Sequence, residues 1–422
     1  MKHTGKLFTA LIAVILVAGC SSAASPSAAP ATAAPTAAPA TAAPTTAPTE
    51  APTAAATEAP TAAPTAATPE AWTQSDIFKG FDPMAVDLTG YTPGPNGEQS
   101  VEASTLPDPT AECLAQVKGK KLAFLNGFAG MTWMSAIEKG VTEQAAEYGI
   151  DVVATASSDF DPAKEASAVE TLMASKPDIL VTIPVDPTAG AQNYKPALDA
   201  GTTIVFYDNP VDGWTGGKEY VAIVTGDHYR MGKNAADLLA KALGEQGTYG
   251  FIQLDVPFYN SNNREKGFLA EMAQQYPNMK NVAWTGFTSD STVGAATDAM
   301  LTQHPDLDGI YVSYSGGPGT AVLASLQNAG NTRVKMVTHD LDAANDVIMA
   351  TKDSNYVGTA IEKTYDEGAN TVKAAVLKIC GVEVPPFIVV PALAVNRDNL
   401  AQSWQDAFRQ DPPPEVTKAL GQ

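Results

Sequence analysis

From residue 121 onward, short apolar runs alternate with longer stretches whose apolar residues recur at three- and four-residue steps. The short runs are rich in β-branched and aromatic residues, which is typical of buried strands, and the longer stretches are typical of amphipathic helices. Strands that alternate with helices at this spacing predict right-handed crossovers and parallel sheets with helices on both faces. Ten strands are predicted, enough for two sheets: 121–126, 150–155, 178–184, 202–208, 220–226, 249–255, 281–286, 309–315, 334–340 and 356–362.

Two of the predicted helices have clear boundaries. In 133–148, an apolar stripe runs from Met134 through Ile137 and Val141 towards Tyr148, so this helix is expected to pack on a sheet. A second helix follows Asp161 as its N-cap, with proline in its first turn, and ends before Pro177. We therefore expect an α/β protein with doubly wound parallel sheets.

The chain begins with the features of an export signal. Residues 1–20 contain two lysines, the apolar run "LFTALIAVILVAG" and then Cys20, and the run is too short to span a membrane. The sequence "LVAGC" resembles the bacterial lipobox, which implies a lipid anchor on Cys20; an ordinary signal that happens to end in cysteine is the alternative. Residues 21–70 repeat Ala, Pro, Thr and Ser, which cannot form a core, so they are predicted to be a disordered tether.

Roughly 350 residues remain after the tether, which suits two lobes better than one core. The chain carries 46 acidic and 26 basic residues, a balance that disfavours nucleic acid and anionic membrane as partners. Three cysteines without a C-x-x-C pair disfavour zinc. If Cys20 is lipidated, Cys113 and Cys380 form either a disulfide or two free thiols.

Polar side chains stand at the predicted strand ends, where parallel α/β sheets place their ligands. The first half offers Trp133, Asp208 and Asn209, and the second offers Asn262, Arg264, Ser315, Asp340 and Glu362. Carboxylates accept from adjacent hydroxyls, a guanidinium donates to two oxygens, and an indole covers the C–H face of a sugar. This set favours a polyhydroxylated ligand that is uncharged or weakly cationic.

The sequence gives little support for an enzyme. "GDHYRMGKN" has the wrong glycine spacing for a phosphate loop, and neither G-x-S-x-G nor H-E-x-x-H occurs. "DLDG" at 306–309 is better interpreted as a turn than as a calcium loop. His339 and Asp340 are adjacent on a strand, so at most one of them can face a cleft. We expect no catalytic residue, cofactor or metal.

The order of these residues resembles the periplasmic binding protein type I family, the ribose- and galactose-type sugar receptors of ABC transporters. The resemblance covers about residues 118–395. Its most specific motifs are "VFYDNP" with Asp208, "NNREKGF" with Arg264 and "MVTHDLD" with Asp340, and "HPDLDGIYVSYSGGPGTAVLASLQNAG" follows the family's strand and helix. The resemblance implies two lobes that close on a ligand about a hinge.

The resemblance also implies a ligand set: Trp133, Met134, Asp208, Asn209, Asn262, Arg264, Ser315, Asp340 and Glu362. A Trp-Met pair replaces the family's double aromatic, Ser315 stands where asparagine is usual, and Glu362 replaces a hinge glutamine. Three carboxylates around Arg264 suggest a cationic or strongly hydrogen-donating ligand, such as an amino sugar or a polyol.

By the family's crossover pattern, 118–225 with 363–387 forms lobe 1 and 226–362 with 388–422 forms lobe 2, which would place Cys113 and Cys380 in one lobe. Residues 71–117 form an extension without an assigned role. The predicted protein is a monomeric, lipid-anchored, extracytoplasmic receptor that delivers a small sugar, amino sugar or polyol to the membrane subunits of an ABC transporter. The alternatives are a receptor that presents its ligand to a membrane chemosensor or signalling protein, and a carbohydrate-active enzyme.

Overall fold

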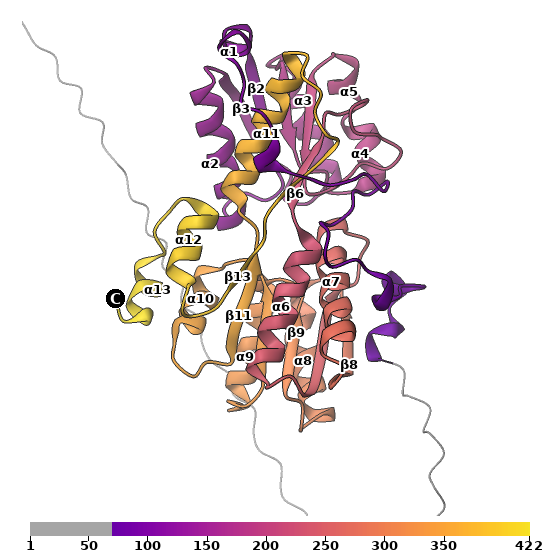
Figure 1. The fold of residues 1–422 in the computed structure, drawn as a ribbon, viewed down its shortest axis with the longest axis vertical. Helices are drawn as coiled ribbons and strands as arrows, with labels where there is room; N and C mark the ends of the chain where they lie inside the picture. Colours follow the sequence, from indigo (N-terminus) through magenta and orange to yellow (C-terminus); the bar gives the residue numbers. More distant parts are fainter. Residues whose placement is uncertain (1–69) are drawn as a thin grey trace, which may run out of the picture. The chain divides into compact units, whose positions relative to one another are not determined.

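The computed structural model describes residues 70–422, which fold around two β-sheets, each covered by helices (Figure 1). The predicted signal segment, its Cys20 and the tether up to residue 69 lie outside the described residues. All ten predicted strands are present, five in each sheet, and all ten pair in parallel with a neighbouring strand. The two-sheet α/β fold is therefore confirmed.

Lobe 1 is built on a seven-stranded, fully parallel sheet in the order β1-β12-β6-β5-β4-β2-β3. Its strands are β1 (Val101–Glu102), β2 (Lys121–Asn126), β3 (Asp151–Ser157), β4 (Ile179–Thr182), β5 (Thr203–Tyr207), β6 (Ile223–Gly226) and β12 (Phe387–Val390). Its helices are α1 (Ala111–Val117), α2 (Thr132–Glu147), α3 (Pro162–Met173), α4 (Pro187–Asn193), α5 (Lys195–Asp199) and α11 (Thr364–Ile379).

Lobe 2 is built on a six-stranded sheet in the order β13-β11-β10-β9-β7-β8, in which only β13 is antiparallel. Its strands are β7 (Gly247–Leu254), β8 (Met279–Phe287), β9 (Gly309–Val312), β10 (Lys335–His339), β11 (Tyr356–Ile361) and β13 (Leu393–Val395). Its helices are α6 (His228–Ala242), α7 (Tyr259–Gln275), α8 (Val293–Gln303), α9 (Thr320–Asn328), α10 (Ala343–Ala350), α12 (Leu400–Phe408) and α13 (Pro414–Leu420).

The chain passes between the two sheets at three short connections: from β6 to α6, from β11 to α11, and from β12 to β13. Each connection leaves one sheet and enters the other lobe within a few residues. Side chains in these connections therefore lie next to both lobes, which matters for Asp227, His228 and Glu362 below.

Burial follows the sequence pattern closely. On α2, Met134, Ile137 and Val141 are fully buried, as the predicted stripe requires, and all three belong to the lobe 1 core. Helix α3 starts at Pro162, and the side chain of Asp161 accepts from the first-turn amides, as predicted for an N-cap. These local signals agree with the tertiary packing.

Each lobe contains a helix pair that approaches too closely for any side chain at the contact. In lobe 1, a Cβ on Gly140 of α2 would collide with the backbone of α11. In lobe 2, a Cβ on Gly232 of α6 would collide with the carbonyl oxygen of Arg264 on α7. The second contact fixes how closely α7, which carries Arg264, packs on α6.

The segment that precedes β1, residues 70–100, runs along both lobes, and we call it the N-terminal strap. Trp72 and Phe78 are buried against the α6–α7 side of lobe 2, and the Trp72 amide donates to Asn281 Oδ1 at 3.0 Å. Farther along, the amide and hydroxyl of Thr92 donate to Oδ1 of Asp227, at 3.1 and 2.9 Å. The strap therefore reaches the β6–α6 connection between the lobes.

Beyond the strap, the chain joins lobe 1. Strand β1 pairs in parallel with β12 at the edge of the sheet, and α1 packs on α11. Cys113 of α1 and Cys380 at the end of α11 form a disulfide, with a Cα–Cα distance of 5.5 Å. Residues 71–117, which had no role assigned from the sequence, thus contact lobe 2 first, then the β6–α6 connection and finally lobe 1.

Candidate functional site

The two sheets present aspartates at equivalent strand ends. Asp208 follows β5 and Asp340 follows β10, and both adopt the left-handed conformation, with φ of 59° and 69°. Each residue still continues the hydrogen bonding of its strand to the neighbouring strand, because the Asp208 amide donates to Val224 O and the Asp340 amide donates to Ala360 O. Aspartate tolerates this backbone at some energetic cost, and such conformations are common at functional sites.

Arg264 lies between the lobes, with 3% of its side chain exposed. Its Nη1 donates to both oxygens of Asp340, at 3.2 and 3.0 Å, and its Nη2 donates to Oε1 of Glu362 at 3.0 Å. Burial lowers the pKa of Arg264, but the charges of the neighbouring carboxylates together outweigh it and raise the pKa, so this guanidinium stays charged although it is buried. The arginine predicted from "NNREKGF" is therefore at the centre of the site.

A hydrogen-bonded relay links Arg264 to Asp208. Arg264 Nε donates to His228 Nδ1 at 3.4 Å, so the proton of the neutral ring is on Nε2, which lies 2.7 Å from Thr225 Oγ1. Thr225 Oγ1 in turn donates to Asp208 Oδ1 at 2.9 Å. Burial, and then the charge of Arg264, hold the pKa of His228 well below its ordinary value, which agrees with a neutral ring.

Glu362 connects the lobes from the β11–α11 connection. It accepts from Arg264 of lobe 2, and it also accepts from the indole N–H of Trp133, at the start of α2 in lobe 1. The half-buried Trp133 ring lies 6.4 Å from the ring of Tyr207. The predicted indole, guanidinium, hinge glutamate and two strand-end aspartates thus meet in one place.

A fourth carboxyl group, which the sequence analysis missed, belongs to Glu367 in the first turn of α11. It is fully buried beside Asp208 and Glu362. An acidic residue in a first helical turn is normally explained by the helix dipole, so the position of Glu367 did not indicate a role at this site. His228 and Thr225 were missed for a similar reason, because no local pattern shows that they face the cleft.

Burial changes the ionisation of these acids. It raises the pKa of Asp208 to about 6 and that of Glu362 to about 8, in both cases against the lowering effect of Arg264. Burial, and then the charges of Asp208 and Glu362, raise the pKa of Glu367 well above its ordinary value. Some of these acids therefore hold protons at neutral pH in this closed arrangement.

Four predicted ligand residues lie in other environments. Asn209 donates to Pro184 O at 3.1 Å, and its Oδ1 is buried without a donor. The other three are occupied by structural contacts. Asn262 caps the loop before α7 by accepting from the Phe258 amide, Ser315 contacts Asn345 and Tyr356, and Met134 lies in the lobe 1 core, where its sulfur accepts from Tyr207. The structure thus does not bring Asn262, Ser315 or Met134 into the Arg264 cluster.

Aromatic side chains line the edge of the interlobe contact. Phe160 of lobe 1 packs against Phe128 of the same lobe and against Phe258 of lobe 2, with ring centroids 6.0 and 5.9 Å apart. Phe128 and Phe160 remain 39% and 38% exposed. Such a rim can exclude water from the charged interior when the lobes meet.

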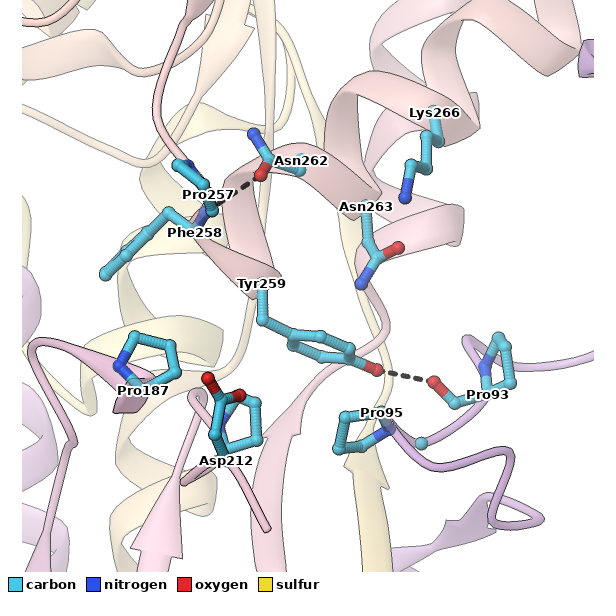
Figure 2. A pocket seen from close by; sticks show the side chains of 12 residues that line it. Pro93, Pro95, Pro187, Asp212, Pro257, Phe258, Tyr259, Asn262, Asn263 and Lys266 are labelled. Carbon is cyan, nitrogen blue, oxygen red and sulfur yellow. Dashed lines mark hydrogen bonds between the residues drawn. The ribbon is translucent and has the colours of Figure 1, made fainter. Parts of the chain in front are cut away.

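A separate hollow of about 370 Å³ lies beside the start of α7 (Figure 2). It is bounded by lobe 1 residues such as Asp212, by Asn263 and Lys266 of α7, and by the strap. Tyr259 points across it and donates to Pro93 O of the strap at 2.5 Å. None of the four carboxyl groups described above lines this hollow, so it is distinct from the Arg264 site.

The described residues also contain one group of potential metal ligands. Asp208, His228 and Glu362 offer atoms within 4.8 Å of one another. However, both nitrogens of His228 are already engaged, one as an acceptor from Arg264 and one against Thr225. Binding a metal through this histidine would break the relay to Asp208.

Among residues 70–422, no helix combines the length and the apolar character that crossing a bilayer requires.

Comparison with known proteins identifies the architecture. The family model described as periplasmic binding protein domain matches residues 122–383, more than half of the chain. The xylitol-binding protein of Mycolicibacterium smegmatis is 24% identical over 58% of this chain and 68% of its own length. The ribose import binding protein of Salmonella typhimurium is 27% identical over 57% of this chain and 78% of its own length.

Among solved structures, an ABC transporter solute-binding protein from Agrobacterium vitis, bound with α-D-tagatopyranose, superposes with a TM-score of 0.61 at 22% identity. The superposition covers 68% of this chain and 98% of that protein. At this level of identity, the similarity establishes the fold.

Proposed function

The chain belongs to the periplasmic binding protein family, and from this premise we propose that it captures a small sugar or polyol between its lobes and delivers it to an ABC transporter. One observation carries the proposal: Trp133 of lobe 1 and Arg264 of lobe 2 both bond Glu362, and Arg264 also bonds Asp340. The His228 and Thr225 relay joins Arg264 to Asp208 of lobe 1. An indole face with bidentate donors and acceptors suits adjacent hydroxyl groups. The family consists of substrate-binding proteins of transporters rather than enzymes.

Capture would proceed by hinge closure. Each lobe supplies half of the contacts, so a ligand that touches both lobes stabilises the closed arrangement over the open one. Among residues 70–422, the three connections and the strap pass from one lobe to the other, so these segments would have to bend. Membrane subunits of the transporter would then recognise the closed form.

The relatives support the ligand class. Two of them are named for xylitol and ribose, and a structural neighbour holds a tagatopyranose. These ligands share several adjacent hydroxyls and an apolar C–H face, which are the two features that the Trp133 and Arg264 surroundings can contact.

The family places the protein outside the cytoplasm. Lipid attachment at Cys20, with residues 21–70 as a tether, would hold it at the membrane surface near the transporter. We further propose that it acts as a monomer, because each chain contains both halves of the site.

A thermal-stability screen with D-ribose, D-tagatose and xylitol tests the function. A ligand at a hundred times its dissociation constant adds about 2.7 kcal/mol to the stability of the folded state. We expect stabilisation of the wild type and of Arg333→Gln, a control on the surface of lobe 2, and no stabilisation of Arg264→Met or Asp340→Asn. Equal stabilisation of all four proteins would place binding elsewhere and refute the proposed site.

A further inference from the structure

With all of its acids ionised, the Arg264 site would carry more negative than positive charge. Asp208, Asp340, Glu362 and Glu367 contribute four carboxyl groups, whereas Arg264 contributes one positive charge. Three of the acids are fully buried, so water cannot screen them effectively. Arg264 contacts Asp340 and Glu362 directly, which leaves the two lobe 1 acids without a cation in contact.

The unpartnered atoms at the site are all of one kind. Asp208 Oδ2, Glu362 Oε2 and both carboxyl oxygens of Glu367 are buried, and none accepts a hydrogen bond from a donor among residues 70–422. A buried polar atom without a partner is costly, and in the ionised carboxylates every such atom is an acceptor. A protonated Glu367 can donate one hydrogen bond to Asp208, which leaves the other oxygens without a donor. A ligand that satisfies this side of the site must bring several donor hydrogens to one place.

His228 does not supply the missing charge. Its Nδ1 accepts from Arg264 Nε, and its Nε2 faces Thr225, so the ring is neutral and both nitrogens are engaged. The same engagement removes the only nitrogen ligand from the Asp208, His228 and Glu362 group. The acceptors that remain at this site belong to Asp208, Glu362 and Glu367.

We propose that the ligand of this site carries a basic nitrogen, as an amino sugar or an amine-bearing polyol does, and that Asp208, Glu362 and Glu367 recognise its ammonium group. This inference rests on the proposed function, since it names the ligand class of the same cleft. An ammonium group brings three donors and one positive charge to a single point, whereas a hydroxyl brings one donor and no charge. Trp133 and Arg264 remain available for the hydroxyls of the same molecule.

Calorimetry at pH 7 with matched pairs tests the inference. The pairs are D-glucitol with 1-amino-1-deoxy-D-glucitol, D-glucose with D-glucosamine, and D-galactose with D-galactosamine, and D-ribose and xylitol serve as neutral references. We expect the amine of at least one pair to bind about tenfold or more tightly than its hydroxyl partner, the low end of the coupling between close charges. Glu367→Gln should remove most of that ratio.

A second variant and a control keep the test independent of folding. Asp208→Asn should reduce the same ratio if Glu367→Gln fails to fold. Asp346→Asn removes another buried carboxyl of lobe 2, which bonds Trp404 and does not contact the four acids, and it should leave the ratio unchanged.

The possible outcomes separate the two proposals. Tighter binding of the neutral member in every pair, or binding of neutral references alone, overturns the ammonium inference and leaves the proposed function standing. Stabilisation by calcium chloride alone, abolished by EDTA, also overturns the inference, because the oxygen cluster would then be a metal site. Failure of every compound, neutral and amine alike, counts against the proposed function itself.

Discussion

Replacing Glu362 with glutamine should make the stability of the ligand-free protein less dependent on pH. Burial raises the pKa of Glu362 from its ordinary value of 4.5 to about 8 in the folded protein. The folded state therefore binds a proton more tightly than the unfolded state does. Stability from this group is fully present below about pH 4.5 and is lost as the pH rises through about 8.

The structure sets the size of the effect. A difference of 1.0 in pKa corresponds to about 1.4 kcal/mol, so the change at Glu362 corresponds to about 5 kcal/mol across this window. Asp208, whose pKa rises to about 6, adds to the loss at lower pH. Because the carboxyls interact, their protons leave as a set, and 5 kcal/mol is an upper limit for one group. Glutamine keeps an acceptor for Arg264 but cannot ionise.

Urea denaturation at pH 5, 6, 7, 8 and 9 measures the effect. We expect the unfolding free energy of the wild type to fall by several kcal/mol between pH 5 and pH 9, and that of Glu362→Gln to fall by clearly less. Glu147→Gln, on the exposed side of α2, should follow the wild type. If Glu362→Gln showed the full wild-type slope, the closed, desolvated cluster would not exist in solution and the reasoning would be wrong.

Three further predictions concern the scaffold. Gly232→Ala should destabilise the protein by about 1–3 kcal/mol in urea and weaken ligand binding, because its Cβ would push away the turn that carries Arg264; an unchanged midpoint would contradict this. Cys113→Ser should lower the unfolding free energy by about 2–5 kcal/mol, and treating the wild type with a reductant should do the same; an equal stability of oxidised and reduced protein would count against the disulfide. Thr92→Val should cost about 1–3 kcal/mol by removing the hydroxyl that donates to buried Asp227 and accepts from the Tyr229 amide, measured by denaturation against Thr92→Ser, which keeps the hydroxyl; equal losses in the two variants would refute the role of the hydroxyl.

The sequence predicted the ten principal strands because each of them is an apolar run long enough to be recognised by itself. The strands that it missed, β1, β12 and β13, have only two to four residues. Their pairing depends on partners far away in the sequence: β1 joins β12, and β13 joins β11. A short segment of this kind becomes a strand only because the fold places an open sheet edge beside it.

The site was predictable where residues follow strands and unpredictable where they begin helices. Asp208 and Asp340 follow their strands directly. They were therefore located by the rule that parallel sheets bind ligands beyond the carboxyl ends of their strands. Trp133 and Met134 are adjacent on α2 and point about 100° apart, so a helix whose stripe buries Met134 can turn only Trp133 towards Glu362. Glu367 also starts a helix, and only the packing of α11 shows that it faces Asp208.

Closure and ionisation are coupled in this protein, because closing the lobes moves carboxyl groups out of water and supplies a single guanidinium to meet them. Asp208 and Glu367 come from lobe 1 and Asp340 from lobe 2, so the open form can leave them hydrated and ionised, whereas the closed form must hold protons or a cation. A neutral ligand would therefore close the lobes together with proton uptake. An ammonium ligand takes the place of those protons and needs less uptake. The direction of proton exchange on binding thus reports the charge of the ligand even before the ligand itself is known.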